Sequence, residues 1–156
     1  MTIIQDRRAL HQIPELDRNL PKTLDYLQTA LKDLNCQVFS PLEGALCAYF
    51  DFGAPKAIAF RAEMDALPIR EETGLPFASQ NEGVMHACGH DLHAASLLGA
   101  AKLLNAHKEE LCGNVKLFFQ PDEEGDGGAQ RMVNEGCLEN PQVDAVFCGH
   151  NSTGTR

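Results

Sequence analysis

The chain shows two hydrophobic periods, one helical and one extended. In residues 20–35 the leucines recur every three or four positions, with Pro21 in the first turn, where a helix accepts proline. A shorter helix is predicted over residues 6–16, ending near Pro14. Apolar runs separated by glycine- and proline-containing turns then predict strands over residues 36–40, 45–52 and 57–65.

The second half of the chain alternates between helices and strands. Residues 66–86 contain two prolines and two glycines and are expected to form a long surface loop, which in a compact domain is usually functional or disordered. The pattern after this loop predicts a helix, a strand, a glycine-led helix and a last strand over residues 91–107, 114–121, 127–136 and 143–150. This alternation indicates an α/β sandwich in which helices flank a central mixed sheet, and 156 residues are one domain by length.

Four polar clusters fall where the predicted strands end or a helix begins. The segments EMD at 63–65, PDEEGDGG at 121–128 and GH at 149–150 each follow an apolar strand, and HACGHD at 86–91 precedes a helix. In α/β folds the reactive groups gather where strands run out into loops. We therefore expect the four clusters to meet at one edge of the sheet.

Cys88 and His90 stand two positions apart, immediately before a predicted helix. On a regular helix two such side chains diverge, whereas in a loop both can turn toward one point. A thiolate and an imidazole are good ligands for zinc and neighbouring divalent metals. Each residue alone is more often a buried thiol or a satisfied polar histidine. Together with Asp91, which could cap the helix or orient His90, they favour a metal site.

Two adjacent carboxylates, Glu123 and Glu124, follow an apolar strand. Adjacent acids are usually solvated surface charge, but at a strand end one carboxylate can bind a metal while its neighbour takes a proton from metal-bound water. Asp65 also ends a strand, and a turn residue and a residue that orients a ligand are equal alternatives there. For His150 a metal ligand and a simple polar residue are likewise equal alternatives.

The other histidines and acidic pairs carry weaker signals. His86 and His93 lie near the cluster, but neighbouring histidines need not all bind a metal. His11 and His107 are interpreted as surface or core residues, and the acidic residues within 70–72 and 109–110 as solvated charge. The chain has neither a phosphate-binding glycine pattern nor a GxSxG nucleophile elbow.

The composition excludes several classes of function. Apolar residues make up 44% and charged residues 22%, which is ordinary for a globular protein, and the formal net charge is −9. The basic residues are scattered, so neither a nucleic acid nor an anionic membrane is an expected partner. With no signal-like N-terminus and no apolar run of membrane-spanning length, the chain is expected to be cytoplasmic. Six cysteines without CxxC spacing then indicate reduced thiols.

Four segments together resemble one enzyme family. RRALHQIPEL at 7–16, RAEMDALPIREETGLPFAS at 61–79, MHACGHDLHAA at 85–95 and FFQPDEEGDGGA at 118–129 are similar to the M20 metallopeptidases. The resemblance is strongest to their amidohydrolase branch, which hydrolyses N-acyl amino acids, hippurate and auxin conjugates. It runs from about residue 7 to residue 150, and the order and spacing of four motifs make it specific.

The resemblance implies a hydrolase that uses two divalent metal ions, for which zinc, manganese, cobalt and nickel are all suitable. The substrate would be an N-acyl amino acid or a related small amide with a recognised free carboxylate. Cys88 matches the ligand that bridges both metals, Glu123 the general base that activates the bridging water, and Asp65 the residue that orients a ligand. Further metal ligands are matched by His90, Glu124 and His150.

The chain departs from the family pattern in three places. Glu63 stands where the branch usually has aspartate, and CGHNS at 148–152 replaces the usual GLHV around the matched histidine. Family members also continue into a lid or dimerisation domain and then return to complete the catalytic domain with another histidine ligand. Residues 1–156 thus correspond to the N-terminal portion of a metallohydrolase catalytic domain without the lid.

Three hypotheses follow from this departure in length. The first is an amide hydrolase whose metal site is partly assembled by this chain. The second is an inactive truncated fragment that folds and forms a homo-oligomer over an uncovered sheet edge and apolar surface. The third, a cysteine hydrolase with Cys88 as nucleophile and a histidine base, ranks last because it explains neither the DEEG segment nor His150.

Overall fold

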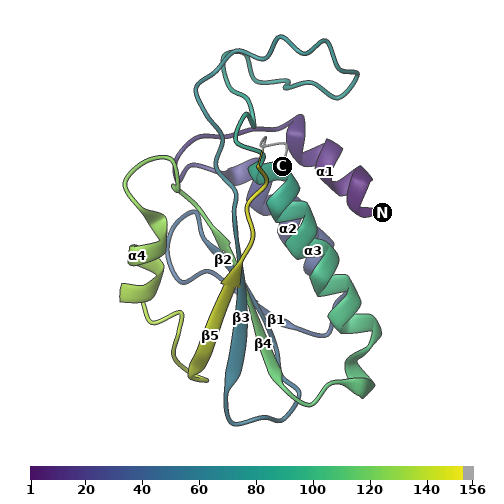
Figure 1. The fold of residues 1–156 in the computed structure, drawn as a ribbon, viewed down its shortest axis with the longest axis vertical. Coiled ribbons are helices and arrows are strands. Elements are labelled where there is room, and N and C mark those ends of the chain that lie inside the picture. The colour runs from purple at the N-terminus through teal and green to yellow at the C-terminus, as the bar shows by residue number, and fades with distance from the viewer. Residues whose placement is uncertain (153–156) are drawn as a thin grey trace.

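Residues 1–152, which the computed structural model describes, form a five-stranded mixed sheet with helices on both faces (Figure 1). The elements in chain order are α1 (Ile3–His11), α2 (Pro21–Leu31), β1 (Gln37–Phe39), β2 (Leu46–Phe50), β3 (Ala57–Glu63), α3 (His90–Ala106), the 3-10 turn η1 (Lys108–Glu110), β4 (Asn114–Gln120), α4 (Gly128–Asn134) and β5 (Val143–Cys148). The α/β architecture expected from the sequence is confirmed.

The strand order β1-β2-β4-β3-β5 places three parallel strands together. β4 inserts between β2 and β3, antiparallel to β2 and parallel to β3, and β5 runs parallel to β3 on its other side. The carboxyl ends of β3, β4 and β5 therefore lie at the same edge of the sheet. The segments that follow these ends carry three of the four polar clusters, as the sequence predicted.

Alternate residues of each strand pack on opposite faces of the sheet. On one face, β2 and β4 contribute Leu46, Leu117 and Phe119 to a core covered by α1, α2 and α3. The other face has a smaller core, in which Phe118 packs against Met132 of α4. No helix among residues 1–152 is long and apolar enough to cross a membrane.

The helix boundaries differ from the predicted ones by a few residues. α1 begins earlier than predicted, at Ile3, because Thr2 and Gln5 form a reciprocal capping box that satisfies two backbone N–H groups. It also ends at His11, before Pro14. α3 begins at His90, directly after Gly89, whose φ of 87° is a left-handed conformation that favours glycine. Residues 66–86 contain no helix and no strand of more than an isolated bridge, as predicted.

Candidate metal centre

Gly89 explains how Cys88 and His90 point toward one region. Its left-handed backbone turns the chain sharply between the two side chains, just where α3 begins. A Cβ at this position would also lie 2.7 Å from the terminal amide of Asn151, so this side chain would have to shift. The two-residue spacing therefore works as a loop arrangement, as the sequence suggested.

The acidic pair is carried by a tight turn built around Asp122. This buried residue has a φ of 59°, and its carbonyl oxygen accepts hydrogen bonds from the N–H groups of Gly127 and Gly128, at 3.2 and 3.0 Å. Its carboxylate accepts a further one from the Asp126 N–H at 3.1 Å. The turn holds Glu123 and Glu124 on its outer side, with side chains 39% and 27% exposed.

His90 lies at the centre of the candidate ligands. Its Nδ1 donates a hydrogen bond to the backbone carbonyl of Asp65 at 2.8 Å, which leaves the lone pair on Nε2. Nε2 is buried and has no hydrogen-bond partner among residues 1–152, although carboxylate oxygens of Glu123 and Glu124 lie 3.8 and 3.9 Å away. A buried nitrogen without a partner costs free energy unless another group, such as a cation, binds it.

The predicted ligands form two overlapping groups within the described residues. Cys88, His90 and His150 each offer a donor atom within 4.8 Å of the others, and so do His90, Glu123 and Glu124. The shortest contact joins Cys88 Sγ to His150 Nε2 at 3.3 Å. Sulfur, nitrogen and carboxylate donors that surround an unpartnered imidazole nitrogen suit borderline divalent metals such as zinc. The residues present therefore fit the metal ions that the resemblance implied.

Asp65 contacts two of the candidate ligands, Glu124 and His90. Its Oδ2 accepts the Glu124 N–H at 3.0 Å, and its Oδ1 lies 3.5 Å from His90 Nδ1. Burial alone would raise the pKa of Asp65, but contacts with His90 and the backbone N–H groups of Glu124 and Glu123 lower it below its usual value. Burial opposes charge on His90, yet the carboxylates of Asp65 and Glu63 raise its pKa overall. The hydrogen bond that orients His90 is therefore made by the backbone carbonyl of Asp65, with the carboxylate beside it.

The thiol of Cys88 has an unfavourable environment for ionisation. Burial, then the hydrogen bond that the thiol donates to Glu124 and the charge of Glu124, and then the charges of Glu123 and Glu63, raise its pKa to about 11. A thiol surrounded by carboxylates is a poor nucleophile at neutral pH because little thiolate is present. A divalent cation in the same place would reverse the local field and deprotonate the thiol.

Two sequence interpretations are wrong in the structure. Asp91 does not cap α3; its Oδ2 instead accepts a hydrogen bond from His11 Nδ1 and forms a salt bridge with Arg7 Nε, both at 2.7 Å. Glu71 is not solvated charge, because its side chain is 4% exposed and lies 3.1 Å from His11 Nε2. His11 thereby links α1, α3 and the long loop, a role that its sequence position does not reveal.

Only weak signals in the sequence indicated that His93 and Glu63 belong to the site. Both are buried, and His93 Nδ1 lies 2.9 Å from Glu63 Oε2. With His90 they form a third group of donor atoms within 4.8 Å. The available signal was helical spacing: His93 lies one turn after His90, on the face of α3 that packs against the sheet.

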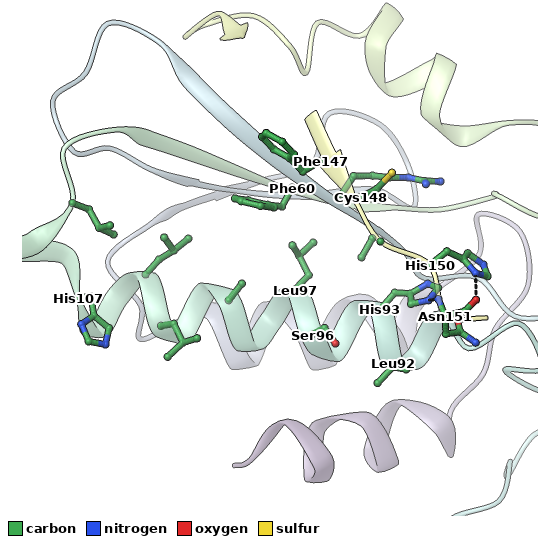
Figure 2. A pocket seen from close by; sticks show the side chains of 17 residues that line it. Phe60, Leu92, His93, Ser96, Leu97, His107, Phe147, Cys148, His150 and Asn151 are labelled. Atoms are coloured by element: carbon green, nitrogen blue, oxygen red, sulfur yellow. Dashed lines mark hydrogen bonds between the residues drawn. The ribbon is translucent and has the colours of Figure 1, made fainter. Parts of the chain in front are cut away.

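An apolar groove of about 850 Å³ extends from this site along α3 (Figure 2). Phe60 and Phe147 approach from the sheet and Leu97 from the helix, while His93 and His150 lie together at one end. Phe147 is 51% exposed and belongs to β5, which within residues 1–152 pairs with β3 alone. The groove therefore joins the candidate ligands to an open sheet edge.

Comparison with known proteins places this site in a family. The model of peptidase family M20/M25/M40 matches residues 59–156, which include all of the candidate metal ligands. The chain belongs to this family.

Three relatives show how much of an M20 protein the chain represents. It is 43% identical over 152 residues to the N-acetyl-L-cysteine deacetylase of Bacillus subtilis, covering 96% of this chain and 36% of that protein. A dinuclear metal-binding M20 peptidase from Bacillus subtilis superposes with a TM-score of 0.90 at 41% identity, covering 96% of this chain and 42% of its own. The aminobenzoyl-glutamate utilization protein from Klebsiella pneumoniae gives 0.76 at 25% identity, covering 97% and 44%. The chain thus spans less than half the length of these M20 relatives.

Proposed function

We propose that residues 1–156 are the N-terminal portion of the catalytic domain of a metal-dependent amidohydrolase that cleaves N-acyl amino acids or related small amides. The observation that carries the proposal is the buried, unpartnered Nε2 of His90, which lies within two groups of sulfur, nitrogen and carboxylate donors. Membership of the M20 family and similarity to a deacetylase of N-acetyl-L-cysteine support an amide bond as the target.

In this proposal Cys88, His90, Glu124 and His150 would hold two divalent ions. When bound, these ions polarise the amide carbonyl and acidify the attacking water. Glu123 takes the proton of that water on its carboxylate and returns it to the leaving amine, a role that its partly exposed side chain allows. The backbone carbonyl of Asp65 accepts the hydrogen of His90 Nδ1, which keeps the lone pair on Nε2, and the Asp65 carboxylate lies beside this bond.

The first test is metal content per chain, measured by elemental mass spectrometry after dialysis against a weak chelator. We expect near-stoichiometric zinc, manganese, cobalt or nickel in the wild type and its loss in the double variant Cys88→Ser, His90→Ala. Cys112→Ser with His107→Ala is a matched control, because both of these side chains are exposed and lie outside the site. Metal in neither the wild type nor the double variant would refute a metal site formed by this chain.

A second test separates metal binding from chemistry. Glu123→Gln keeps the size of the side chain but cannot accept the proton. We expect it to bind metal within a few-fold of the wild type and to lower hydrolysis of N-acetyl amino acids by about 10²- to 10⁴-fold. Equal hydrolysis by both proteins would show that Glu123 is not the base.

The cysteine-hydrolase alternative has one contact in its favour, the 3.3 Å between Cys88 Sγ and His150 Nε2. The raised pKa of the thiol argues against it, since a thiolate nucleophile needs a lowered one. Alkylation of metal-free protein decides the matter. Slow reaction of Cys88 with iodoacetamide at neutral pH supports the metal site, and rapid reaction supports the nucleophile.

The inactive, self-associating fragment is supported by the apolar groove and by the exposed Val146 and Phe147 on β5. Open edge strands and apolar patches of this kind promote association. Light scattering after size-exclusion chromatography tests it. A dimer that Phe147→Lys converts to a monomer, without hydrolysis by either form, would favour this alternative over the hydrolase.

A further inference from the structure

His93 uses both of its ring nitrogens, and the partners determine its tautomer. Its Nε2 accepts a hydrogen bond from the backbone N–H of Asn151 at 3.1 Å. A backbone N–H can only donate, so Nε2 carries no proton and the ring hydrogen lies on Nδ1. Nδ1 then donates to Glu63 Oε2 at 2.9 Å. His93 thus bridges a carboxylate and a peptide group.

The peptide group that His93 holds belongs to the residue directly after His150. The Nδ1 of His150 donates to the Asn151 carbonyl at 2.6 Å, which leaves its Nε2 facing Cys88 Sγ. The His93 and His150 rings lie edge to face with centroids 4.6 Å apart. Figure 2 shows His93, His150 and Asn151 grouped at one end of the groove. The backbone that carries His150 is therefore tied to the first turn of α3.

A salt bridge and a further hydrogen bond extend this chain of polar contacts to the other strand ends. Glu63 Oε1 pairs with Arg61 Nη1 at 2.5 Å, and Arg61 Nε donates to Gln120 Oε1 at 2.6 Å. Gln120 is the last residue of β4, from which the turn with the acidic pair begins. The chain Gln120–Arg61–Glu63–His93–Asn151 thus connects the ends of β4, β3, α3 and β5, and the candidate ligands lie next to three of these elements, α3, β4 and β5.

We propose that His93 is a positioning residue. Its hydrogen bond with the Asn151 N–H fixes the position of His150, and its hydrogen bond with Glu63 couples that position to the ends of β3 and β4. This inference rests on the proposed metal-dependent function. It also assigns a common role to two of the three places where the chain departs from its family branch, since Glu63 and the Asn151 N–H bind opposite sides of one imidazole. A metal ligand role for His93 would break one of these two hydrogen bonds.

Two substitutions separate the two bonds of His93. The side-chain amide of His93→Gln can place its oxygen where Nε2 was and keep the bond from Asn151. The amide of His93→Asn can place its nitrogen where Nδ1 was and keep the bond to Glu63. Both variants lose one bond and remove the ring, so they match each other in cost to the fold. Amide NMR spectra and urea midpoints confirm that each folds.

The first measurement uses metal-free protein. We expect a scalar coupling across the hydrogen bond between Asn151 N and His93 Nε2 in the wild type. We also expect a nuclear Overhauser contact between the His150 ring and the Cys88 β-protons in the wild type and in His93→Gln. This contact should be lost in His93→Asn. Absence of the coupling, or the same His150 contact in both variants, overturns the proposal.

The second measurement titrates the 156-residue chain with Co²⁺ and follows the thiolate-to-metal absorption. We expect His93→Asn to weaken binding about 10- to 100-fold, as loss of a partner that orients a ligand does, and His93→Gln to weaken it at most a few-fold. Equal affinity in the two variants overturns the positioning role. A wild type that binds no Co²⁺ would instead refute the proposed function, and the metal-free NMR measurement would then decide the role of His93.

Discussion

Replacing Asp65 by asparagine tests whether its carboxylate holds two of the candidate metal ligands, His90 and Glu124, in place. The carboxylate lies 3.5 Å from His90 Nδ1 and accepts the Glu124 N–H at 3.0 Å, so it contacts two candidate ligands at once. At an effective dielectric constant of about 20, a full charge pair at that distance is worth roughly 5 kcal/mol before desolvation, an upper bound. Partners that orient metal ligands usually contribute 10- to 100-fold in affinity, about 1.4 to 2.7 kcal/mol.

The assay is competition for Zn²⁺ against a chromophoric chelator. We expect Asp65→Asn to bind 10- to 100-fold more weakly than the wild type, and the pKa of His90, followed by NMR in metal-free protein, to fall because the neighbouring negative charge is gone. Asp144→Asn is the control, since that carboxylate is 49% exposed and pairs with Lys56 at the opposite end of β5. Unchanged zinc affinity with an unchanged pKa of His90 would show that Asp65 is only a turn residue.

Three further results are expected. Metal binding near neutral pH should release about one proton from Cys88, whose pKa is about 11 without metal. The binding enthalpy measured by calorimetry should then depend on the ionisation enthalpy of the buffer, and the same binding enthalpy in all buffers would refute the prediction. Burial lowers the pKa of His86 to about 4, so between pH 6.5 and 4 the unfolded chain binds a proton that the native chain does not. The free energy of unfolding should therefore fall by up to about 3 kcal/mol as the pH drops from about 6.5 to 4. In urea unfolding at several pH values, His86→Asn should show a smaller decrease over this range. Gly128→Ala should lower the free energy of unfolding by about 2 kcal/mol or more, because its Cβ would overlap the Pro121 carbonyl oxygen. Gly113→Ala is the control, since nothing lies within 4 Å of a Cβ there. Equal urea midpoints for the two variants would contradict the prediction.

The strand ends could be predicted from the sequence because they depend on short-range patterns. Apolar runs over 57–65 and 114–121 mark buried strands, and the polar residues that follow them must leave the sheet at its edge. The order in which strands pair was not needed, since any parallel arrangement of these strands brings their carboxyl ends together. The prediction that the polar clusters lie at one edge of the sheet therefore needed no knowledge of the topology.

The contacts of His93, His11 and Glu71 could not be predicted in the same way. His93 meets the Asn151 N–H across 58 residues, and His11 meets Asp91 across 80. Such pairs depend on how α1 and α3 pack on the sheet, which periodicity does not specify. Glu71 stands in a sequence that resembles solvated charge, and only the fold shows that Thr73, Ser79 and His11 surround its carboxylate.

The electrostatics of the metal-free chain connect these observations. His90 presents a buried Nε2 without a partner, the Cys88 thiol has a raised pKa, and the carboxylates of Glu123 and Glu124 face both residues. A stable core satisfies its buried polar atoms, so this arrangement costs free energy as it stands. One kind of group removes all three costs: a divalent cation accepts the imidazole lone pair, stabilises the thiolate and neutralises the carboxylates. The chemistry of these donor atoms thus supports the proposed metal site on grounds other than the family resemblance.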